Sequence, residues 1–382
     1  MYQYIDNPQA LTEFVSRIRN QPWIVIDTEF IRERTYYPQL CLIQIAAGDD
    51  MACIDPIALT DLSELYEVFH DPNVIKVFHA AQQDLEILYY GSGQVPSPIF
   101  DTQPAASILG IGDQIGYAGL VEQVLGVSLA KAESRTDWSR RPLSQAQLEY
   151  AIDDVRYLQQ LYPTILSMLE KGGRLKWPKR DFDRLTNSET YQLNARTRWQ
   201  KVKGLQNLNR RQLSVLRELA AWREEEAAKR NRPRRWIIGD EVLVDLARIQ
   251  PSDVDGIQAI RGVNADQAKK YAQPWFDCMA AGLELPEAEW PQMKRRKKPT
   301  PENDALAELL MLVIRLEAER HDITPSAITS KKQVVDMLEE GRTTLSEDWR
   351  GELVNDAIVK VLEKQTVLGV ESGKAQLLDW PE

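Results

Sequence analysis

The segment Trp23-Ile24-Val25-Ile26-Asp27-Thr28-Glu29-Phe30 is an apolar, strand-like run that ends in two carboxylates, one residue apart. Alternate residues of a strand point to the same face of a sheet, so the side chains of Asp27 and Glu29 converge. Burying two like charges together costs several kcal/mol unless a cation neutralises them. The pair therefore either opens a solvated loop or binds a divalent metal ion, and the apolar run before it favours a central strand.

The size and charge of the chain limit what it can be. At 382 residues and 43.7 kDa it should form two or three domains. We expect a cytoplasmic protein, because no apolar run of about 18 residues is present and the first residues lack the features of a signal peptide. Cys41, Cys53 and Cys278 lack the spacing of metal ligands and fit reduced thiols. A net charge of -10 requires any contact with nucleic acid to be locally basic.

Strand and helix signals alternate in the first part of the chain. Gly48-Asp49-Asp50 lies between two apolar stretches and predicts a hairpin turn, and hence an antiparallel pair of strands. The other predicted elements are strands at 40–46, 51–54 and 74–78 and helices at 62–69 and from Gln82 onward. This alternation predicts an α/β domain with a mixed sheet.

Beyond about Lys201 the strand signals disappear, and long amphipathic helices such as 212–229 and 305–319 take over. The change of class marks a domain boundary, and we predict two tandem helical modules. Between them lies Met293-Lys294-Arg295-Arg296-Lys297-Lys298-Pro299, which has the composition of an exposed linker.

A third acid, Asp84, lies in His79-Ala80-Ala81-Gln82-Gln83-Asp84, where a strand gives way to the first turn of a helix. Complementation of the helix dipole would by itself explain a carboxylate at this place. Asp84 is therefore a candidate ligand only in combination with the other acids.

A further acid is carried by a helix whose start is well marked. Ser144-Gln145-Ala146-Gln147 is a capping box and predicts a helix over 145–161. On it Tyr150 and Asp154 are four residues apart and share one face, and Asp153 competes for the same position. A half-buried tyrosine beside a solvated acid pair would produce the same pattern.

These acids together with Tyr150 resemble, in order and local context, the acidic-plus-tyrosine signature of the 3′-5′ exonucleases of the proofreading superfamily. The intervening segments are similar to the ribonuclease D family. They are Ile26-Asp27-Thr28-Glu29-Phe30, Arg34-Thr35-Tyr36-Tyr37-Pro38-Gln39-Leu40, Phe100-Asp101-Thr102-Gln103 and Glu133-Ser134-Arg135-Thr136-Asp137-Trp138. The helical modules look like the paired HRDC-type domains shared by this family and certain helicases. The resemblance covers nearly the whole chain and is weakest in the last module.

The resemblance implies an α/β ribonuclease-H-like exonuclease domain with a mixed sheet over 1–200, followed by two small all-α helical domains of the HRDC type. These would occupy 206–290 and 300–376, with the basic linker at 291–299. The implied activity is hydrolytic removal of 5′-mononucleotides from an RNA 3′ end with two divalent ions, and maturation of the 3′ ends of tRNA precursors and other small structured RNAs.

The acids of the family fall on Asp27, Glu29, Asp84 and Asp154, and its tyrosine falls on Tyr150. All match in residue type, and the family spacing selects Asp154 over Asp153. Phosphodiester hydrolysis needs an activated water and compensation for charge on the phosphate, which two hard cations supply. Mg²⁺ or Mn²⁺ prefers carboxylate oxygens, and the candidate site has no cysteine to favour zinc.

We assign Asp27 as the bridging ligand, Glu29 and Asp154 to the metal that carries the attacking water, and Asp84 to the leaving-group side. Tyr150 would orient the water through its hydroxyl, because a phenol with a pKa near 10 is a poor base at neutral pH. For His79 we predict a buried, hydrogen-bonded role rather than that of a general base.

The stretch that leads into the Tyr150 helix interleaves cations with an aromatic residue, as single-stranded nucleic acid requires. The candidate RNA contacts are Lys131, Arg135, Trp138 and Arg141. A solvated loop with Trp138 packed into the core is the alternative. A second basic stretch, Lys229-Arg230-Asn231-Arg232-Pro233-Arg234-Arg235-Trp236, lies in the first helical module, where the resemblance implies a grip on structured RNA.

Two other functions stay open at this point. A DNA exonuclease of the same chemistry would carry the same acids, because contacts to the 2′-hydroxyl can come from backbone groups. A non-catalytic RNA-binding module on a nuclease fold would be marked by a lost carboxylate, and none is lost. We expect a monomer, since no coiled-coil heptads are present.

Overall fold

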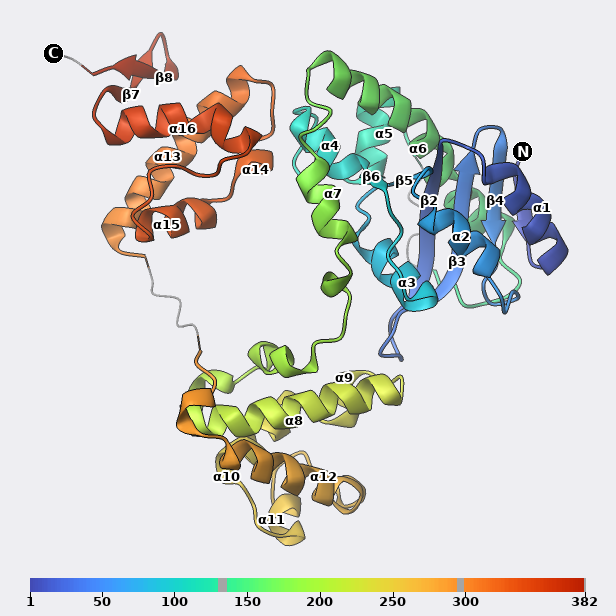
Figure 1. Cartoon of the computed structure of the whole chain (residues 1–382), viewed down its shortest axis with the longest axis vertical. Coiled ribbons are helices and arrows are strands. Elements are labelled where there is room, and N and C mark those ends of the chain that lie inside the picture. Colours follow the sequence, from blue (N-terminus) through green and yellow to red (C-terminus); the bar gives the residue numbers. More distant parts are fainter. Residues whose placement is uncertain (130–135, 294–298, 381–382) are drawn as a thin grey trace. The chain divides into compact units, whose positions relative to one another are not determined.

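The structure is a computed structural model that describes residues 1–129, 136–293 and 299–380. The chain forms two compact units (Figure 1). The first consists of Met1–Glu29, Leu40–Thr190 and Lys297–Glu382, and the second of Phe30–Gln39 and Tyr191–Arg296. In the described ranges, every helix is either too short or too polar to cross a lipid bilayer.

The first unit is built on a six-stranded sheet with the order β1-β4-β3-β2-β5-β6. β3 and β4 are antiparallel, whereas β1 and β4, β2 and β5, and β5 and β6 are parallel pairs. The strands are β1 (Gln3–Ile5), β2 (Trp23–Ile31), β3 (Gln39–Ala47), β4 (Asp50–Ile54), β5 (Ile75–Phe78) and β6 (Ile99–Asp101). The predicted mixed sheet and the hairpin at Gly48 are confirmed, with Ala47 paired to Asp50 across the turn.

Strand β2 is an interior strand of this sheet, between β3 and β5. Its residues Ile24, Val25 and Ile26 are fully buried, as expected for a strand that is covered on both faces. The predicted central strand that leads to Asp27 and Glu29 is therefore confirmed.

Helices surround this sheet, as Figure 1 shows. They are α1 (Pro8–Ile18), α2 (Ser63–His70), α3 (Gln82–Ser92), α4 (Thr102–Ile108), α5 (Tyr117–Leu125), α6 (Gln145–Lys171) and α7 (Lys179–Thr186). Helix α6 begins at the predicted capping box, where the Ser144 hydroxyl accepts from the Gln147 N–H and the Gln147 amide oxygen accepts from the Ser144 N–H. It runs to Lys171, beyond the predicted end at residue 161.

The C-terminal part of the first unit is a helical bundle with a terminal hairpin. Its elements are α13 (Pro301–Arg320), α14 (Pro325–Ile328), α15 (Lys331–Glu339), α16 (Trp349–Leu362), β7 (Thr366–Glu371) and β8 (Lys374–Asp379). The hairpin corrects the expectation that no strands follow Lys201. Its turn, Ser372-Gly373, has φ angles of +52° and +79°, the left-handed pair that a tight hairpin needs, and this short Ser-Gly signal was missed.

Aromatic and ionic contacts join this bundle to the turn between α6 and α7 and to α7 itself. The rings of Trp177 and Trp349 are stacked in parallel with their centroids 4.4 Å apart. The indole N–H of Trp349 donates to the Trp177 carbonyl at 3.0 Å, and Arg350 pairs with Asp181 at 2.7 Å. The bundle is therefore packed on the domain that contains the sheet.

The second unit is helical. Its main helices are α8 (Arg210–Lys229), α9 (Arg234–Ile237), α10 (Asp240–Ile249), α11 (Val254–Gln258) and α12 (Ala265–Glu284). Its core contains the fully buried Leu216, Leu219 and Trp275. The turn between β2 and β3 also belongs to this unit, so Tyr36 shares one core with residues of α8 and α12. The predicted change to helical structure after Lys201 is confirmed.

Candidate active site

Asp27 and Glu29 lie near the end of β2, on alternate residues of the strand. Asp154 reaches the same place from α6. One oxygen from each of the three carboxylates can be chosen so that all lie within 4.8 Å of one another. The structure therefore brings together the strand pair and the helix acid that the sequence suggested, over a separation of more than a hundred residues.

Asp84 lies in the first turn of α3 and is buried. Its carboxylate accepts a hydrogen bond from the hydroxyl of Thr28, the residue between the two strand acids. The start of α3 is fixed by Asp101, whose two oxygens accept from the N–H groups of Ala80 and Ala81 at 2.9 Å. Asp101 and Thr28 both lie in segments that resemble the family, although neither was singled out as a site residue.

Burial and mutual repulsion raise the pKa of every acid in this cluster. For Asp27 the cause is burial first and then the charge of Asp154, and for Asp84 burial and then the charge of Asp27. Burial and the charges of Asp27, Asp154 and Asp84 raise the pKa of Glu29. The pKa of Asp154 rises to about 7, chiefly through burial and then through Asp153 and Asp84. Without a cation the cluster is a concentration of unfavourable negative charge.

This donor set fits a hard divalent cation. It offers only carboxylate oxygens, which Mg²⁺ and Mn²⁺ prefer, and sulfur and imidazole ligands, which favour zinc, are absent from the described cluster. Such a cation would relieve the repulsion that raises these pKa values. Divalent-metal dependence is thus supported by the geometry of the acids.

Tyr150 lies one helical turn before Asp154 on α6, with its ring 6.2 Å from that of Trp138. Burial, followed by the charges of Asp154, Glu29 and Asp27, raises the pKa of its phenol. Its hydroxyl therefore stays protonated at neutral pH. Asp153 is oriented differently, since it forms an ion pair with Arg156.

Two residues near the acids have roles that bear on the sequence predictions. His79 bonds to the Thr102 hydroxyl at 2.9 Å and to the Ile115 carbonyl at 3.0 Å, and burial lowers its pKa to about 4. The predicted hydrogen-bonded histidine is present, although its side chain is half-buried rather than fully buried. Tyr117, which was missed, donates to the Asp153 carbonyl at 2.8 Å, and burial and then the charges of Asp154 and Asp27 raise its pKa. No local pattern marks it, because its partners are distant in sequence.

The candidate RNA contacts divide into two groups. Lys131 and Arg135 lie outside the described residues. Trp138 is buried, and the Arg141 guanidinium donates to both oxygens of Asp55, at 2.6 and 2.7 Å, and to the Cys41 carbonyl at 2.6 Å. Direct RNA contact by Trp138 or Arg141 stays a prediction, and it would require them to give up these internal contacts.

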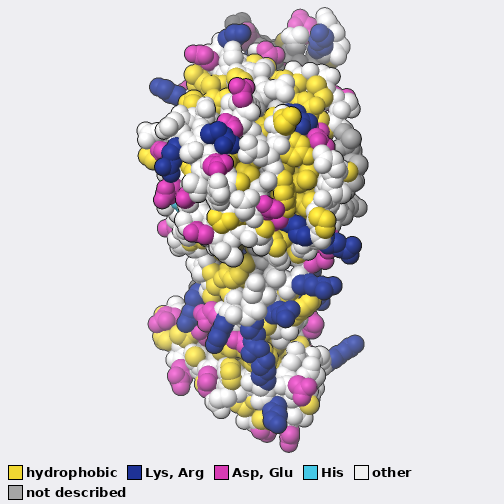
Figure 2. Space-filling view, turned by 90° about the vertical axis from the view of Figure 1, so that its right-hand side faces the viewer, with side chains coloured by type: hydrophobic (Ala, Val, Ile, Leu, Met, Phe, Trp, Pro, Cys, Tyr) yellow, Lys and Arg dark blue, Asp and Glu magenta, His cyan; other side chains and the backbone are white. Residues whose placement is uncertain are grey.

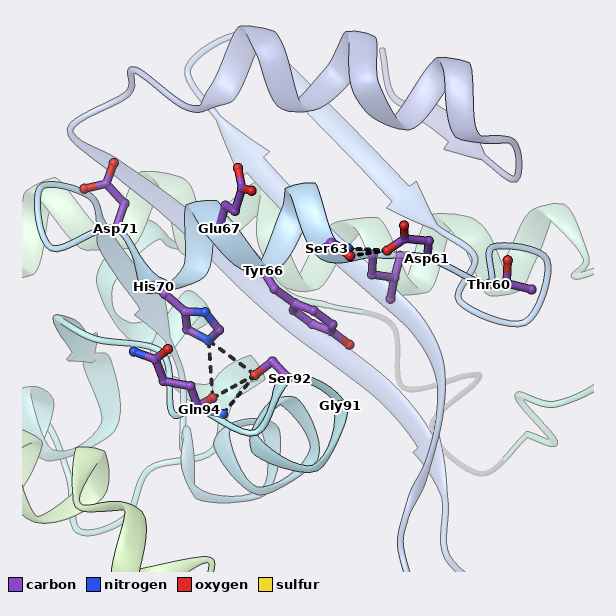
Figure 3. A pocket seen from close by; sticks show the side chains of 11 residues that line it. Thr60, Asp61, Ser63, Tyr66, Glu67, His70, Asp71, Gly91, Ser92 and Gln94 are labelled. Atoms are coloured by element: carbon purple, nitrogen blue, oxygen red, sulfur yellow. Dashed lines mark hydrogen bonds between the residues drawn. The ribbon is translucent and has the colours of Figure 1, made fainter.

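A pocket of about 760 Å³ lies elsewhere on the first unit, between α2 and the end of α3 (Figure 3). His70 faces it and bonds to the Ser92 hydroxyl at 3.2 Å. Its rim carries Asp61, Glu67 and Asp71, which would repel phosphate. None of the clustered acids lines it, so the acid cluster and not this pocket is the candidate active site.

The comparisons with known proteins agree with this geometry. Residues 2–170 match the family model described as 3′-5′ exonuclease, and residues 212–279 match the HRDC domain. Ribonuclease D of Gluconacetobacter diazotrophicus is 38% identical over 97% of this chain and 95% of its own length. The chain belongs to the ribonuclease D family. Ribonuclease D of Granulibacter bethesdensis, 36% identical over 98% of this chain and 96% of its own length, is a second such relative.

A solved ribonuclease D structure has the same fold. The crystal structure of Escherichia coli RNase D, described as an exoribonuclease involved in structured RNA processing, matches with a TM-score of 0.80 and 32% identity. It covers 95% of this chain and 99% of its own. As a ribonuclease D family member the chain is a 3′-5′ exoribonuclease, and two-metal chemistry is typical of the family. The predicted fold class and HRDC domain are confirmed, apart from the missed hairpin β7–β8.

Proposed function

We propose that this exoribonuclease shortens RNA with a free 3′ end, releasing 5′-mononucleotides, and that it matures the 3′ ends of tRNA precursors and other small structured RNAs. The observation that carries the proposal is the convergence of Asp27, Glu29 and Asp154 within 4.8 Å, with Asp84 joined to them through Thr28. Membership of the ribonuclease D family and the similarity to an enzyme of structured RNA processing support the substrate class.

Two divalent ions, Mg²⁺ or Mn²⁺, are proposed for this site. Asp27 would bridge them, Glu29 and Asp154 would hold the ion on the side of the attacking water, and Asp84 would serve the leaving-group side. Bound there, the ions would lower the pKa of the water and stabilise the negative charge that develops on the phosphate. The acids would hold the ions in place, and the acids themselves are carried by β2, α3 and α6.

Tyr150 is proposed to orient the attacking water. Because burial and the neighbouring carboxylates raise its pKa, its hydroxyl is a donor and not a base at neutral pH. The water attacks the phosphorus atom, the bond from phosphorus to the 3′ oxygen breaks, and the shortened RNA keeps a free 3′-hydroxyl. The terminal nucleotide leaves as a 5′-monophosphate, so the next residue meets the same site.

The helical parts are proposed to bind the body of the RNA, with domain limits of 206–290 and 300–376 and an exonuclease domain at 1–200. In the space-filling view, Lys and Arg side chains gather on the second unit (Figure 2). Lys229, Arg230, Arg232 and Arg235 are exposed there. Locally basic surface on an acidic protein is what phosphate binding requires. The proposed RNA contacts near the acids remain Lys131, Arg135, Trp138 and Arg141, on a monomeric, cytoplasmic enzyme.

Digestion of a 3′-extended tRNA precursor and of a DNA strand of the same sequence tests the proposal. Each is incubated with Mg²⁺, with EDTA, and with the Asp27→Asn variant, and Asp153→Asn is the matched control on the neighbouring acid. Metal-dependent release of mononucleotides from the RNA, lost in Asp27→Asn and kept in Asp153→Asn, is expected. Preferred digestion of the DNA would reject the substrate class, and binding without digestion would leave only an RNA-binding module.

A further inference from the structure

The turn between β2 and β3 is part of the helical unit rather than of the sheet. Residues 32–38 connect the two strands, and Tyr36 within them is only 6% exposed. Its ring belongs to the same buried core as Leu219 and Trp275, and Tyr37 packs against that core. An exposed hairpin turn does not normally bury a tyrosine in another part of the chain. The turn is therefore a docked element.

Side-chain contacts hold Tyr36 in this core. Its hydroxyl donates a hydrogen bond of 2.5 Å to Glu224, which is completely buried, and the guanidinium of Arg234 lies 4.8 Å above its ring. Arg234 also donates to Glu224 at 2.6 Å, and Arg198 pairs with Glu224 at 3.0 Å. The buried carboxylate is thus compensated by two cations and by the hydroxyl from the turn.

The backbone of the turn is held as well. The side-chain oxygen of Asn231 accepts from the N–H of Tyr36 at 3.0 Å and from the N–H of Tyr37 at 3.1 Å. Asn231 itself has a left-handed φ of +47°, a conformation that asparagine adopts more readily than most residues. These residues lie 194–195 positions apart, so the contact has no local cause.

The docked turn is continuous in sequence with one particular strand. β2 carries Asp27 and Glu29 and continues directly into the docked turn. We propose that the turn is an anchor which attaches the RNA-binding helical unit to the metal-ligand strand, and that Tyr36, Asn231 and Glu224 are positioning residues for structured RNA. The inference rests on the proposed function, since it assumes that RNA is bound by the helical unit and cut at the acids.

An anchor of this kind acts on substrate delivery and not on the chemical step. RNA held by the helical unit would present its 3′ end to the acids at a high effective concentration while the docked turn joins that unit to β2. A short single-stranded oligonucleotide reaches the acids without this help. Releasing the turn should therefore raise KM for structured RNA and leave kcat unchanged.

The test uses a variant that removes the polar contacts and preserves the packing. In Tyr36→Phe/Asn231→Gly the ring remains, and glycine accepts the left-handed φ without strain. Gln250→Gly is the matched control, because Gln250 is also left-handed, with φ of +53°, and lies in the same unit. The rate of trypsin cleavage after the exposed Arg32 and Arg34 reports release of the turn. If the first variant releases the turn only in part, Tyr36→Ala/Asn231→Gly also removes the ring.

With the turn released, KM for a hairpin RNA with a single-stranded 3′ tail should rise about tenfold, while kcat and all constants for a short oligonucleotide stay unchanged. The control should match the parent enzyme. Faster trypsin cleavage with an unchanged KM for the hairpin RNA would overturn the anchor, and so would an equal loss of kcat on both RNAs. Failure of the parent enzyme to digest either RNA would instead remove the proposed function.

Discussion

The hydroxyl of Thr28 donates a hydrogen bond to the carboxylate of Asp84, so the residue between the two strand acids also holds the acid of α3. Thr28 is buried, and its neighbours Asp27 and Glu29 form the cluster of carboxylates with Asp154. Three consecutive residues of β2, Asp27 to Glu29, therefore supply two carboxylates and hold a third, that of Asp84. This is why a substitution that leaves every acid in place can still impair the site.

Thr28→Val keeps the shape of the side chain and removes the donor. The Asp84 carboxylate then loses a partner that favours its charged form, so a metal ion should bind it less well. We expect a loss of about 10–100-fold in apparent Mg²⁺ affinity or activity, as is usual for groups that orient metal ligands. Activity measured against Mg²⁺ concentration checks this, and Thr28→Ser should restore most of it. Full activity of Thr28→Val at low Mg²⁺ would contradict the role.

Asp27→Asn should abolish digestion and yet stabilise the metal-free protein. Burial and the charge of Asp154 raise the pKa of Asp27, which means that its ionised form destabilises the folded state near neutral pH. Removing that charge should raise Tm in EDTA by about 2–4 °C for each kcal/mol of repulsion relieved. Thermal unfolding of Asp27→Asn beside Asp153→Asn, whose partner is Arg156, measures this. A lower Tm for Asp27→Asn would reject the account of the cluster.

The stabilisation by Mg²⁺ should grow as the pH rises. In the metal-free protein, burial and then Asp153 and Asp84 raise the pKa of Asp154 to about 7. A raised carboxyl pKa means that the folded state binds more protons than the unfolded state, so the stability of this form falls between about pH 4 and about pH 7. Mg²⁺ displaces those protons. The gain in Tm on adding Mg²⁺ should be larger at about pH 8 than at about pH 5.5, where bound protons compete with the metal. An equal gain in Tm at both pH values would contradict this competition between protons and Mg²⁺.

The sequence carries the parts of the site that depend on local pattern. The period-two strand ending at Asp27 and Glu29 and the capping box before α6 both appear as predicted, because each is determined by neighbouring residues. Asp153 and Asp154 could not be separated by helix geometry alone. The structure separates them through Arg156, which pairs with Asp153.

Long-range contacts explain what the sequence did not reveal. Tyr117 and Thr28 support the acids through partners 36 and 56 residues away. The docking of Tyr36 on Glu224 spans 188 residues, and no periodicity predicts such a contact. The β7–β8 hairpin is a different case, since its Ser372-Gly373 turn is a local signal that the strong helical pattern around it obscured.

Arg141 provides a test that separates RNA contact from structural support. Its side chain forms an ion pair with the buried Asp55 at 2.6 Å. Burial raises the pKa of Asp55, but hydrogen bonds from Arg141 and Tyr4 outweigh this effect and lower the pKa overall. The ion pair of Arg141 and Asp55 therefore stabilises the fold fully at pH values above the pKa of an aspartate in the unfolded chain. This stabilisation is lost as the pH falls through the lowered pKa of Asp55. Arg141→Gln and Asp55→Asn should each cost about 3 kcal/mol of stability by leaving a buried partner unpaired. If Arg141 only supports the structure, both variants should have the same KM for RNA, whereas a higher KM in Arg141→Gln alone would show direct contact.

Trp236 is the exposed aromatic residue of the basic stretch in the helical unit. It is 56% exposed, with the guanidinium of Arg232 5.8 Å from its ring, and it lines a pocket together with Arg230 and Lys270. An exposed aromatic ring among cations can stack on an unpaired base, at about 1–3 kcal/mol per base. Trp236→Ala should therefore weaken binding of structured RNA by about tenfold or more, while digestion of a short oligonucleotide stays unchanged.

Trp290, which lies under Arg210 in the same unit, supplies the control through Trp290→Ala. Filter binding of a tRNA precursor at two salt concentrations measures the effect. Because stacking is not ionic, the affinity lost in Trp236→Ala should be the same at both, whereas a loss confined to low salt would assign the contact to Arg232 and the other cations.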